Sequence, residues 1–420
     1  MDQLPFTDDT VIFGLLCLCL GFVFYTSSIK TGFWTKFYGV VPTVLMCYLL
    51  PGILASFGII SAEQSNVDET ASNFLLPAAL ILMTLSIDLK AIINLGSKAL
   101  IMFFTGTVGI IIGGPLAILI VSIFSPDTVG GVGIDAVWRG LATIAGSWIG
   151  GSANQIAMLE IFEFNESKYS GMVLVDIIMA NLWLGFLLFG VGKTKRIDTW
   201  LKADTSSIEQ LKQKVSTYTQ KIARVTSLSD LMMLLFYAFV GVGLAHFLGQ
   251  YFTEFLVNNF EIVRDKEKIF SSLGSPFLWM VVFATIIGIG LSFTKAKNYE
   301  GAGASKIGGM LVYVLVATVG MKMDLSRIAE NPGLIIVGFV WITIHAGLLI
   351  LVAKLIKAPY FFLAVGSQAN VGGAASAPVV AAEFHPSLTS VGILLAVFGY
   401  VVGTAGAYIC ALLMEVASKV

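Results

Sequence analysis

Charged residues are scarce in this chain of 420 residues. Only 12% of the residues are Asp, Glu, Lys or Arg, 57% are hydrophobic, and the mean hydropathy is +0.88. A soluble domain has about 25% charged residues, and a chain this apolar cannot cover its own surface with polar groups. The composition therefore argues against a soluble catalytic domain and predicts an integral membrane protein.

The chain is also poor in the residues that bind nucleic acid or metals. Its 25 basic and 26 acidic residues leave a net charge of −1, so no basic surface for nucleic acid is expected. No P-loop, nucleophile elbow, HExxH motif or Cys/His metal spacing occurs. Cys17, Cys19, Cys47 and Cys410 lie in apolar runs, which predicts small buried side chains rather than disulfides or ligands. We therefore expect no enzymatic activity, and no cofactor other than a bound sodium ion.

Long apolar runs account for most of the chain. A spanning helix needs about 20 apolar residues, because the hydrocarbon core of a bilayer is about 30 Å thick. The N-terminal residues MDQLPFTDD are acidic where a signal peptide is basic, so no cleaved targeting segment is expected. The pattern predicts an all-α, multi-pass protein of the cell membrane, surrounded by lipid, with about twelve spans and a range of eleven to thirteen. The candidate spans lie at about 10–29, 37–60, 73–92, 99–124, 139–162, 169–192, 231–252, 272–293, 307–323, 333–353, 360–383 and 389–413.

The longest polar segment separates two halves of similar length. Residues 193–230 alternate charged and apolar side chains at helical spacing, which predicts an amphipathic helix on the membrane surface. A plain solvated linker is an equally good interpretation. The expected organisation is a first membrane repeat at 1–192, a linker at 193–230 and a second membrane repeat at 231–420.

Two pairs of similar segments occur in the same order in both halves. Residues 75–92 (LLPAALILMTLSIDLKAI) match 311–328 (LVYVLVATVGMKMDLSRI), and 141–153 (LATIAGSWIGGSA) match 363–375 (LAVGSQANVGGAA). Two ordered matches predict a duplication, and transporters are commonly built from such repeats, with binding at their interface.

Loop charges bear on the orientation of the repeats. The positive-inside rule favours halves that are inverted relative to each other. However, the basic linker also favours the cytoplasm. Inverted halves need an odd number of crossings between equivalent points, so six spans in each half do not allow both. Either one span near 139–265 is miscounted or one charge signal misleads. The rule places basic loops near 30–36, 90–98, 295–306 and 354–357 inside, and acidic loops at 61–70 and 125–135 outside.

Glycine pairs and amides interrupt two of the expected spans. The segments are GSWIGGSANQIA (146–157) and GSQANVGGAASAP (366–378). Glycine costs about 1 kcal/mol relative to alanine inside a helix, and unwound backbone at membrane depth is tolerated only inside protein or beside a watery cavity. The segments predict two crossing, discontinuous helices. The expected break residues are Gly150, Gly151, Gly372, Gly373 and Pro378, the last starting a new half-helix. The alternative is close helix packing through small residues, without unwinding.

A solute site is expected between the two breaks. The N-terminus of a half-helix attracts anions, and its carbonyl end attracts cations. The residues predicted to line the site are Ser152, Asn154, Gln155, Gln368, Asn370 and Ser376.

An acidic residue lies well inside the span at 169–192. Asp176 must be neutralised by a proton, a cation or a basic partner, and this span contains no basic residue before Lys193. We therefore predict that Asp176, with Asn181, forms a coupling site for sodium, and a proton is the alternative. A structural Asp that is hydrogen-bonded to a neighbouring helix is a further interpretation.

Other polar residues of the spans have simpler interpretations. Asp88 and Asp324 are expected to pair with charges at the helix ends, and His345 is expected to be a fully bonded core histidine. Arg139 is expected to extend to the lipid headgroups. Four polar residues that follow the Gly-rich spans are expected at the membrane interface: Glu160, Glu163, Glu383 and His385.

The Gly-rich segments at 147–157 and 366–382 resemble the paired signatures of the YjcL-like membrane proteins, known as domain of unknown function 819. The similarity covers nearly the whole chain. This resemblance implies kinship with the superfamily of cation:proton antiporters and anion transporters. It therefore implies an inverted repeat, two crossing broken helices and elevator-type alternating access. The antiporter branch often has an adjacent Asp pair, whereas this chain has the single Asp176.

Two classes of function remain open from the sequence. The first is a secondary transporter, expected to be a sodium symporter of an organic acid, amino acid or short peptide, with a cation/proton antiporter as the alternative. The second is a non-transporting membrane protein, such as an intramembrane enzyme or a structural or sensory subunit. Because an elevator needs an immobile scaffold, a homodimer through the spans at 10–60 and 231–293 is expected.

Overall fold

The protein is almost entirely helical. The computed structural model describes residues 5–39, 41–86, 92–93, 95–206, 208, 225–264, 273–323, 331–385 and 388–419. These residues contain no β-strand, only one isolated parallel bridge between Phe6 and Ile60. The predicted all-α class is confirmed.

The first half of the chain contains the following elements: α1 (Asp9–Ser28), α2 (Gly32–Tyr38), α3 (Thr43–Ser56), α4 (Val67–Leu85), α6 (Ser97–Ser122), α7 (Pro126–Val129), η1 (Gly133–Asp135), α8 (Val137–Ile161), η2 (Glu166–Lys168), α9 (Tyr169–Val191) and α10 (Thr194–Leu201). The second half contains α12 (Leu228–Asn259), α13 (Glu261–Arg264), α14 (Pro276–Ser292), η4 (Lys295–Ala302), α15 (Ala304–Lys322), α16 (Leu334–Leu355), α17 (Tyr360–Val371), α18 (Gly373–Phe384) and α19 (Thr389–Ala417).

Helices occupy all twelve of the predicted span ranges, but not all of them qualify as spans. Among the described residues, seven helices are long and apolar enough to cross a membrane, or up to nine if two bent helix pairs each count as one span. The first turn of α4 contains Asp68 and Glu69, and α8 combines Arg139 with several Gly, Ser and amide residues. The count of twelve spans therefore stays a prediction, whereas the multi-pass character is established.

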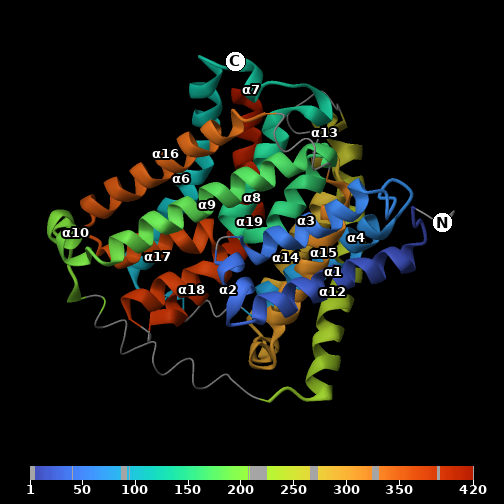
Figure 1. Ribbon diagram of the computed structural model, residues 1–420, viewed down its shortest axis with the longest axis horizontal. Helices are drawn as coiled ribbons and strands as arrows, with labels where there is room; N and C mark the ends of the chain where they lie inside the picture. Colours follow the sequence, from blue (N-terminus) through green and yellow to red (C-terminus); the bar gives the residue numbers. More distant parts are fainter. Residues whose placement is uncertain are drawn as a thin grey trace.

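The helices form two bundles that lie side by side (Figure 1). We call the first bundle the panel; it consists of α1, α3, α4, α12, α14 and α15, which pack chiefly on one another. We call the second the core bundle; it consists of α6, α8, α9, α16, α17, α18 and α19. Contacts between the bundles are sparse and run mainly from α4, α14 and α15 to α8 and α19. Both halves of the chain contribute helices to both bundles.

The outer faces of the panel are apolar. Helix α12 exposes Phe236, Phe247 and Tyr251, and α1 exposes Leu18 and Tyr25. A helix that is apolar on its exposed side as well as its buried side indicates contact with lipid or with another protein. These faces agree with a membrane location.

Three of the four cysteines have the predicted environment. Cys19, Cys47 and Cys410 are buried, and all four thiols are free. Cys17 is exposed, because it faces outward from α1. The prediction of small core side chains therefore holds for three of them.

The linker begins with a short amphipathic helix. Asp198 of α10 accepts a hydrogen bond from the backbone N–H of Tyr360 (2.7 Å) and so caps α17. Burial raises the pKa of Asp198 above its usual value. Residues 207 and 209–224 of the linker lie outside the described residues, as do Asp88 and Asp324.

Candidate functional site

The helix α8 is interrupted at Gly151. This residue has φ 74° and ψ −176°, which is not helical, and it divides α8 into half-helices at 137–150 and 152–161. A positive φ strains any side chain but costs glycine little. The second residue of the Gly150–Gly151 pair is therefore where the backbone turns.

A second interruption separates α17 from α18. Helix α17 ends at Val371, and α18 begins at Gly373, which has φ 53°. Gly372 lies between the two helices with φ −111° and ψ −6°. Here too the second glycine of the pair has a positive φ.

Pro378 does not start the second half-helix. It lies inside α18, which already begins at Gly373. Because proline lacks an N–H group, it leaves one carbonyl of the preceding turn without its helical partner. The expected role of Pro378 as the first residue of a half-helix is wrong.

One face of α19 packs against both interruptions. Its glycines 392, 399, 403 and 406 recur at spacings of seven, four and three, which places them on one side of the helix. A Cβ added at Gly399 would lie 2.9 Å from the carbonyl oxygen of Ile149 and 3.5 Å from that of Ala369. The carbonyl ends of both first half-helices therefore approach α19 at the same residue.

Gly403 makes the closest approach to the first break. A Cβ at this position would lie 2.6 Å from the Cα of Gly150 and 2.6 Å from the Nδ2 of Asn154. Gly399 and Gly403 form a GxxxG spacing, the arrangement that lets helix backbones touch within a membrane. The glycines therefore serve both for close helix packing and for the break in the helix, so the two interpretations of the Gly-rich segment do not exclude each other.

Asn154 bridges the first break. Its Nδ2 donates to the carbonyl of Gly150 (2.8 Å), and its Oδ1 accepts a hydrogen bond from the Thr404 hydroxyl of α19 (2.6 Å). The side chain is fully buried. The amide therefore joins the two half-helices to each other and to α19.

Asn370 makes the same kinds of contact in α17. Its Nδ2 donates to the carbonyls of Gly366 and Phe103 (both 3.0 Å), and its Oδ1 accepts from the Thr107 hydroxyl of α6 (2.7 Å). Asn154 and Asn370 thus share one bonding pattern: a carbonyl four residues earlier and a threonine on another helix. Asn154 bonds across its break, whereas Asn370 fixes the end of α17 to α6, and no solute contact is needed to explain the burial of either amide.

Gln368 and Ser376 link α17 and α18 across the second break. The Nε2 of Gln368 donates to the Ser376 hydroxyl (2.6 Å). Gln368 is 1% exposed, yet its Oε1 has no hydrogen-bond partner among the residues that the structure describes. A buried acceptor without a partner calls for a donor or a cation, so this oxygen is available to a ligand. At the other break, Ser152 is half-buried.

Asp176 contacts both halves of α8. Its carboxylate accepts hydrogen bonds from Trp148 Nε1 (2.7 Å) and Gln155 Nε2 (3.1 Å), which lie on opposite sides of Gly151. Within the described part of the chain, no Lys, Arg or His forms an ion pair with this carboxylate. The carboxylate is buried and has neutral donors only.

Asn181 lies outside this network. Its side chain is exposed and donates to the carbonyl of Ile177 in its own helix (2.8 Å). The structure therefore gives no geometric support to its predicted role beside Asp176.

His345 is a fully bonded core histidine, as expected. Its Nδ1 donates to the carbonyl of Gly106 (3.0 Å), because a carbonyl can only accept. Its Nε2 then accepts from the Ser367 hydroxyl (2.7 Å), which in turn accepts from Trp183 Nε1 (2.8 Å). These bonds tie α6, α9, α16 and α17 together.

Arg139 has a partner inside the protein. It donates to the carbonyl of Phe162 and lies over the Trp138 ring, 5.1 Å from its centroid. These contacts fix the side chain to the other end of its own helix rather than leaving it free to extend to the headgroups.

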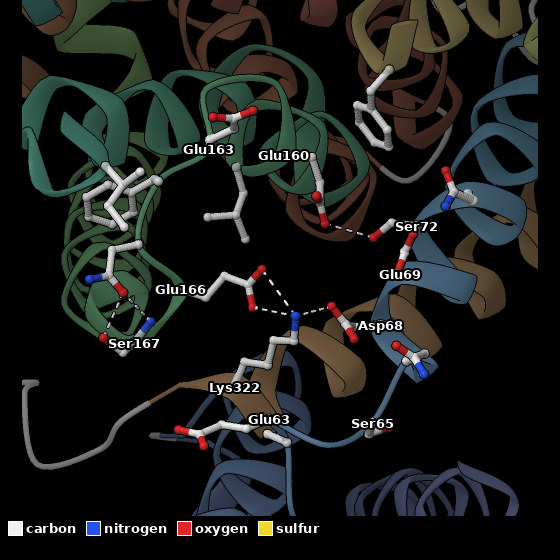
Figure 2. Close-up of a pocket in the computed structure, with 18 residues that line it drawn as sticks. Glu63, Ser65, Asp68, Glu69, Ser72, Glu160, Glu163, Glu166, Ser167 and Lys322 are labelled. Carbon is white, nitrogen blue, oxygen red and sulfur yellow. Dashed lines mark hydrogen bonds and ion pairs between the residues drawn. The ribbon is translucent and has the colours of Figure 1, made fainter. Parts of the chain in front are cut away.

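A cavity of about 850 Å³ lies at the junction of the two bundles (Figure 2). The panel contributes residues of α4, Phe277 of α14 and Lys322 of α15, whereas the core bundle contributes the ends of α8 and η2. Its charged lining residues are mostly acidic: Glu63, Asp68, Glu69, Glu160, Glu163, Glu166 and Lys322. None of the predicted solute residues lines this cavity, which we call the vestibule.

Several of these residues gave little signal in the sequence. The glycine face of α19 could have been found from its spacing. Thr107, Thr404 and Trp148 are ordinary span residues, and only the fold brings them to the amides and to Asp176. The acidic cavity combines the predicted interfacial residues Glu160 and Glu163 with residues of α4, η2, α14 and α15.

The comparison with known proteins establishes the family. The model of the family described as "Protein of unknown function (DUF819)" matches residues 14–417. The chain belongs to this family. It is also 24% identical over 365 residues to the "Uncharacterized membrane protein YjcL" of Bacillus subtilis (strain 168), which covers 84% of each chain.

Membership of the DUF819 family agrees with the membrane location. The relative is described as a membrane protein, and its name assigns no substrate, coupling ion or mechanism. The functional argument for this chain therefore rests on its own site.

Proposed function

We propose that the protein is a secondary active transporter that moves a small polar solute across the membrane. One observation carries this proposal: two interrupted helices meet on a shared glycine face of α19, with the carbonyls of Ile149 and Ala369 both close to Gly399. Interrupted helices at membrane depth are tolerated where they are buried or line a site, and they are costly elsewhere. Two interrupted helices that pack on the same helix, α19, support a binding function.

The polar groups at the breaks suit a small solute. Gln368 offers a buried oxygen that accepts no hydrogen bond from the described part of the chain, and Ser152 and Ser376 are half-buried hydroxyl residues beyond the breaks. The N-termini of the second half-helices attract negative charge, and the carbonyl ends attract positive charge. The solute site is proposed at these groups, while Asn154, Gln155 and Asn370 position the half-helices.

The charge of the vestibule narrows the solute class. Six carboxylates and one lysine line the cavity between the bundles. A cleft lined by one sign of charge concentrates solutes of the opposite sign. Amino acids and short peptides are therefore favoured over organic acids among the proposed substrates.

Movement of the core bundle against the panel is proposed as the transport step. The two bundles have few mutual contacts, and both breaks lie in the core bundle. Helices α4 and α15 contain the first parts of the matching segments 75–92 and 311–328, and they pack on each other. Helix α4 also packs on α14, which precedes α15, and α15 also packs on α3, which precedes α4. This symmetry supports two repeats. The proposal includes inverted repeats, about twelve spans, elevator-type access and a place in the superfamily of cation:proton antiporters and anion transporters.

Sodium coupling is proposed at Asp176. A buried carboxylate without a basic partner requires a cation or a proton, and its neighbours Trp148 and Gln155 donate only neutral hydrogen bonds. The same geometry gives cation/proton antiport as a second candidate, because the carboxylate could carry a proton instead. Imposing sodium and proton gradients separately distinguishes the two.

The amides at the breaks provide a first test. Asn154→Leu and Asn370→Leu each remove a side chain that joins a break to a threonine, and each leaves partners unbonded at a cost of about 1–3 kcal/mol. We expect purified variants that remain folded but show only background uptake of labelled amino acids in proteoliposomes under a sodium gradient. Asn181→Leu is the matched control, because Asn181 is exposed and bonds only within α9.

Two results would count against this assignment. Undiminished uptake in both break variants would remove Asn154 and Asn370 from the transport machinery. If no gradient drives uptake by the unmodified protein, a non-transporting membrane protein becomes the better interpretation.

The panel is the proposed dimer surface. Its helices α1 and α12 expose large apolar side chains, including Tyr25, Phe236 and Phe247. If the panel is the immobile scaffold, two panels can pack together while both core bundles move. Native mass spectrometry from nanodiscs should show a dimer, and a monomer under all detergent and lipid conditions would contradict the proposal.

A further inference from the structure

Two polar contacts cross the cavity between the panel and the core bundle. Lys322, the last residue of α15, bonds Asp68 of α4 within the panel. Its Nζ also lies 3.1 Å from Oε2 of Glu166, which belongs to η2 at the start of the core helix α9. Figure 2 shows the Lys322 ammonium between these two carboxylates.

The second contact lies on the neighbouring wall. The Ser72 hydroxyl of α4 donates to Oε1 of Glu160 near the end of α8 (2.9 Å). Each contact joins a panel helix to the core bundle at the same cavity. Apolar side chains of both bundles also pack together in one buried cluster, so these polar links add to an apolar junction.

We propose that Lys322 is a latch that holds the core bundle against the panel and so limits the rate of the transport step. The inference rests on the proposed function, because it assigns the latch to the movement of the core bundle. The Lys322 side chain is 25% exposed and that of Asp68 is 11% exposed. Partial burial strengthens such a pair relative to a fully exposed one, whose contribution is small.

The geometry separates the two bonds of Lys322. The Asp68 bond lies within the panel, whereas the Glu166 bond joins the panel to the core bundle. Glu166→Gln therefore removes the charge attraction between the bundles, because an amide oxygen accepts only a weaker hydrogen bond from Lys322, while the panel pair stays intact. Lys322→Met breaks both bonds and also leaves two carboxylates facing each other without a counter-charge, which favours separation of the bundles.

Hydrogen exchange of the full-length protein in nanodiscs tests the latch without any solute. We expect faster exchange in Glu166→Gln, and more so in Lys322→Met, in peptides 44–50 of the panel and 166–172 of the core bundle. These peptides contain Tyr48 and Tyr169, whose rings pack across the junction with centroids 6.1 Å apart. Lys322→Arg should restore the slow exchange, because it keeps the positive charge between the carboxylates.

Two control variants each remove one charge but leave the Lys322–Glu166 ion pair intact. Glu163→Gln removes an exposed acid from the same cavity. Lys98→Met removes a base of α6 whose partner Asp204 (2.9 Å) lies, like Lys98 itself, outside the cavity lining and outside both peptides. Both controls should exchange like the unmodified protein. Unchanged exchange in Glu166→Gln and Lys322→Met, or equal acceleration in the controls, would overturn the latch.

Solute uptake then connects the latch to transport. We expect the initial uptake rate in proteoliposomes to rise several-fold in Glu166→Gln relative to Glu163→Gln. Faster exchange without a faster uptake rate would overturn the rate-limiting role. If the unmodified protein transports nothing, the proposed function fails, while the exchange measurement still decides whether Lys322 holds the bundles together.

Discussion

Gly403→Val is expected to destabilise the protein severely and to abolish transport. Its added Cβ would lie 2.6 Å from the Cα of Gly150, a backbone atom that no side-chain rotation can move. Forcing this contact apart costs about 3 kcal/mol, the upper end of the usual range for overpacking. It would also displace the Asn154 amide, and with it the bond to Thr404.

A matched glycine isolates the effect of this contact. Gly243 and Gly290 have no atom within 4 Å of an added Cβ, so Gly243→Val or Gly290→Val in the panel adds the same side chain without a clash. Thermal unfolding in detergent should show a large loss of stability for Gly403→Val alone. Equal stability of Gly403→Val and the control would show that α19 does not touch the first break.

Asp176→Asn is expected to remove sodium dependence while the fold persists. The Asn Oδ1 can still accept from Trp148 Nε1, and its Nδ2 can donate to Gln155 once the Gln155 amide turns over. The bonds to Trp148 and Gln155 thus survive, while the charge is lost. Without a carboxylate, a cation has no counter-charge at this position.

Two measurements check the Asp176 prediction. Sodium chloride should raise the melting temperature of the unmodified protein more than choline chloride does, and this difference should vanish in Asp176→Asn. The variant should equilibrate the solute across the liposome membrane without concentrating it. If the Asn variant still concentrates the solute in a sodium-dependent way, Asp176 is structural and the coupling ion binds elsewhere.

The helix positions were largely predictable from the sequence, but their number as spans was not. Apolar runs of about 20 residues mark helices because backbone groups in lipid must bond within their own segment. The same criterion fails for α4 and α8, which bury several polar residues inside the bundles, among them Asp68, Asn154 and Gln155. A hydropathy average cannot distinguish a polar residue that is satisfied inside a bundle from one outside the membrane.

The Gly pairs identified the segments that depart from helical geometry, because only glycine adopts the positive φ of Gly151 and Gly373 cheaply. The partners of those segments were not predictable. Thr404 lies 250 residues from Asn154, and Thr107 lies 263 residues from Asn370. Neither threonine stands out among the hydroxyl residues of its span. Such pairings are consequences of how the core bundle assembles.

The role of the amides also changed once the fold was known. The sequence predicts that Asn154 and Asn370 line a solute site, because their amide groups can bind a polar solute. In the structure their bonds go to backbone carbonyls and to threonines, so they position the breaks. Residue type alone cannot distinguish an amide that binds a ligand from one that replaces a lost helical bond.

Accumulation of a labelled solute in proteoliposomes tests the central claim most directly. The unmodified protein should concentrate an amino acid or short peptide above the external level under an inward sodium gradient, and an ionophore that collapses the gradient should release it. Gly403→Val and Asp176→Asn should show no concentration, whereas Asn181→Leu should match the unmodified protein. Failure of amino acids, short peptides and organic acids alike to accumulate under either a sodium or a proton gradient would contradict the account.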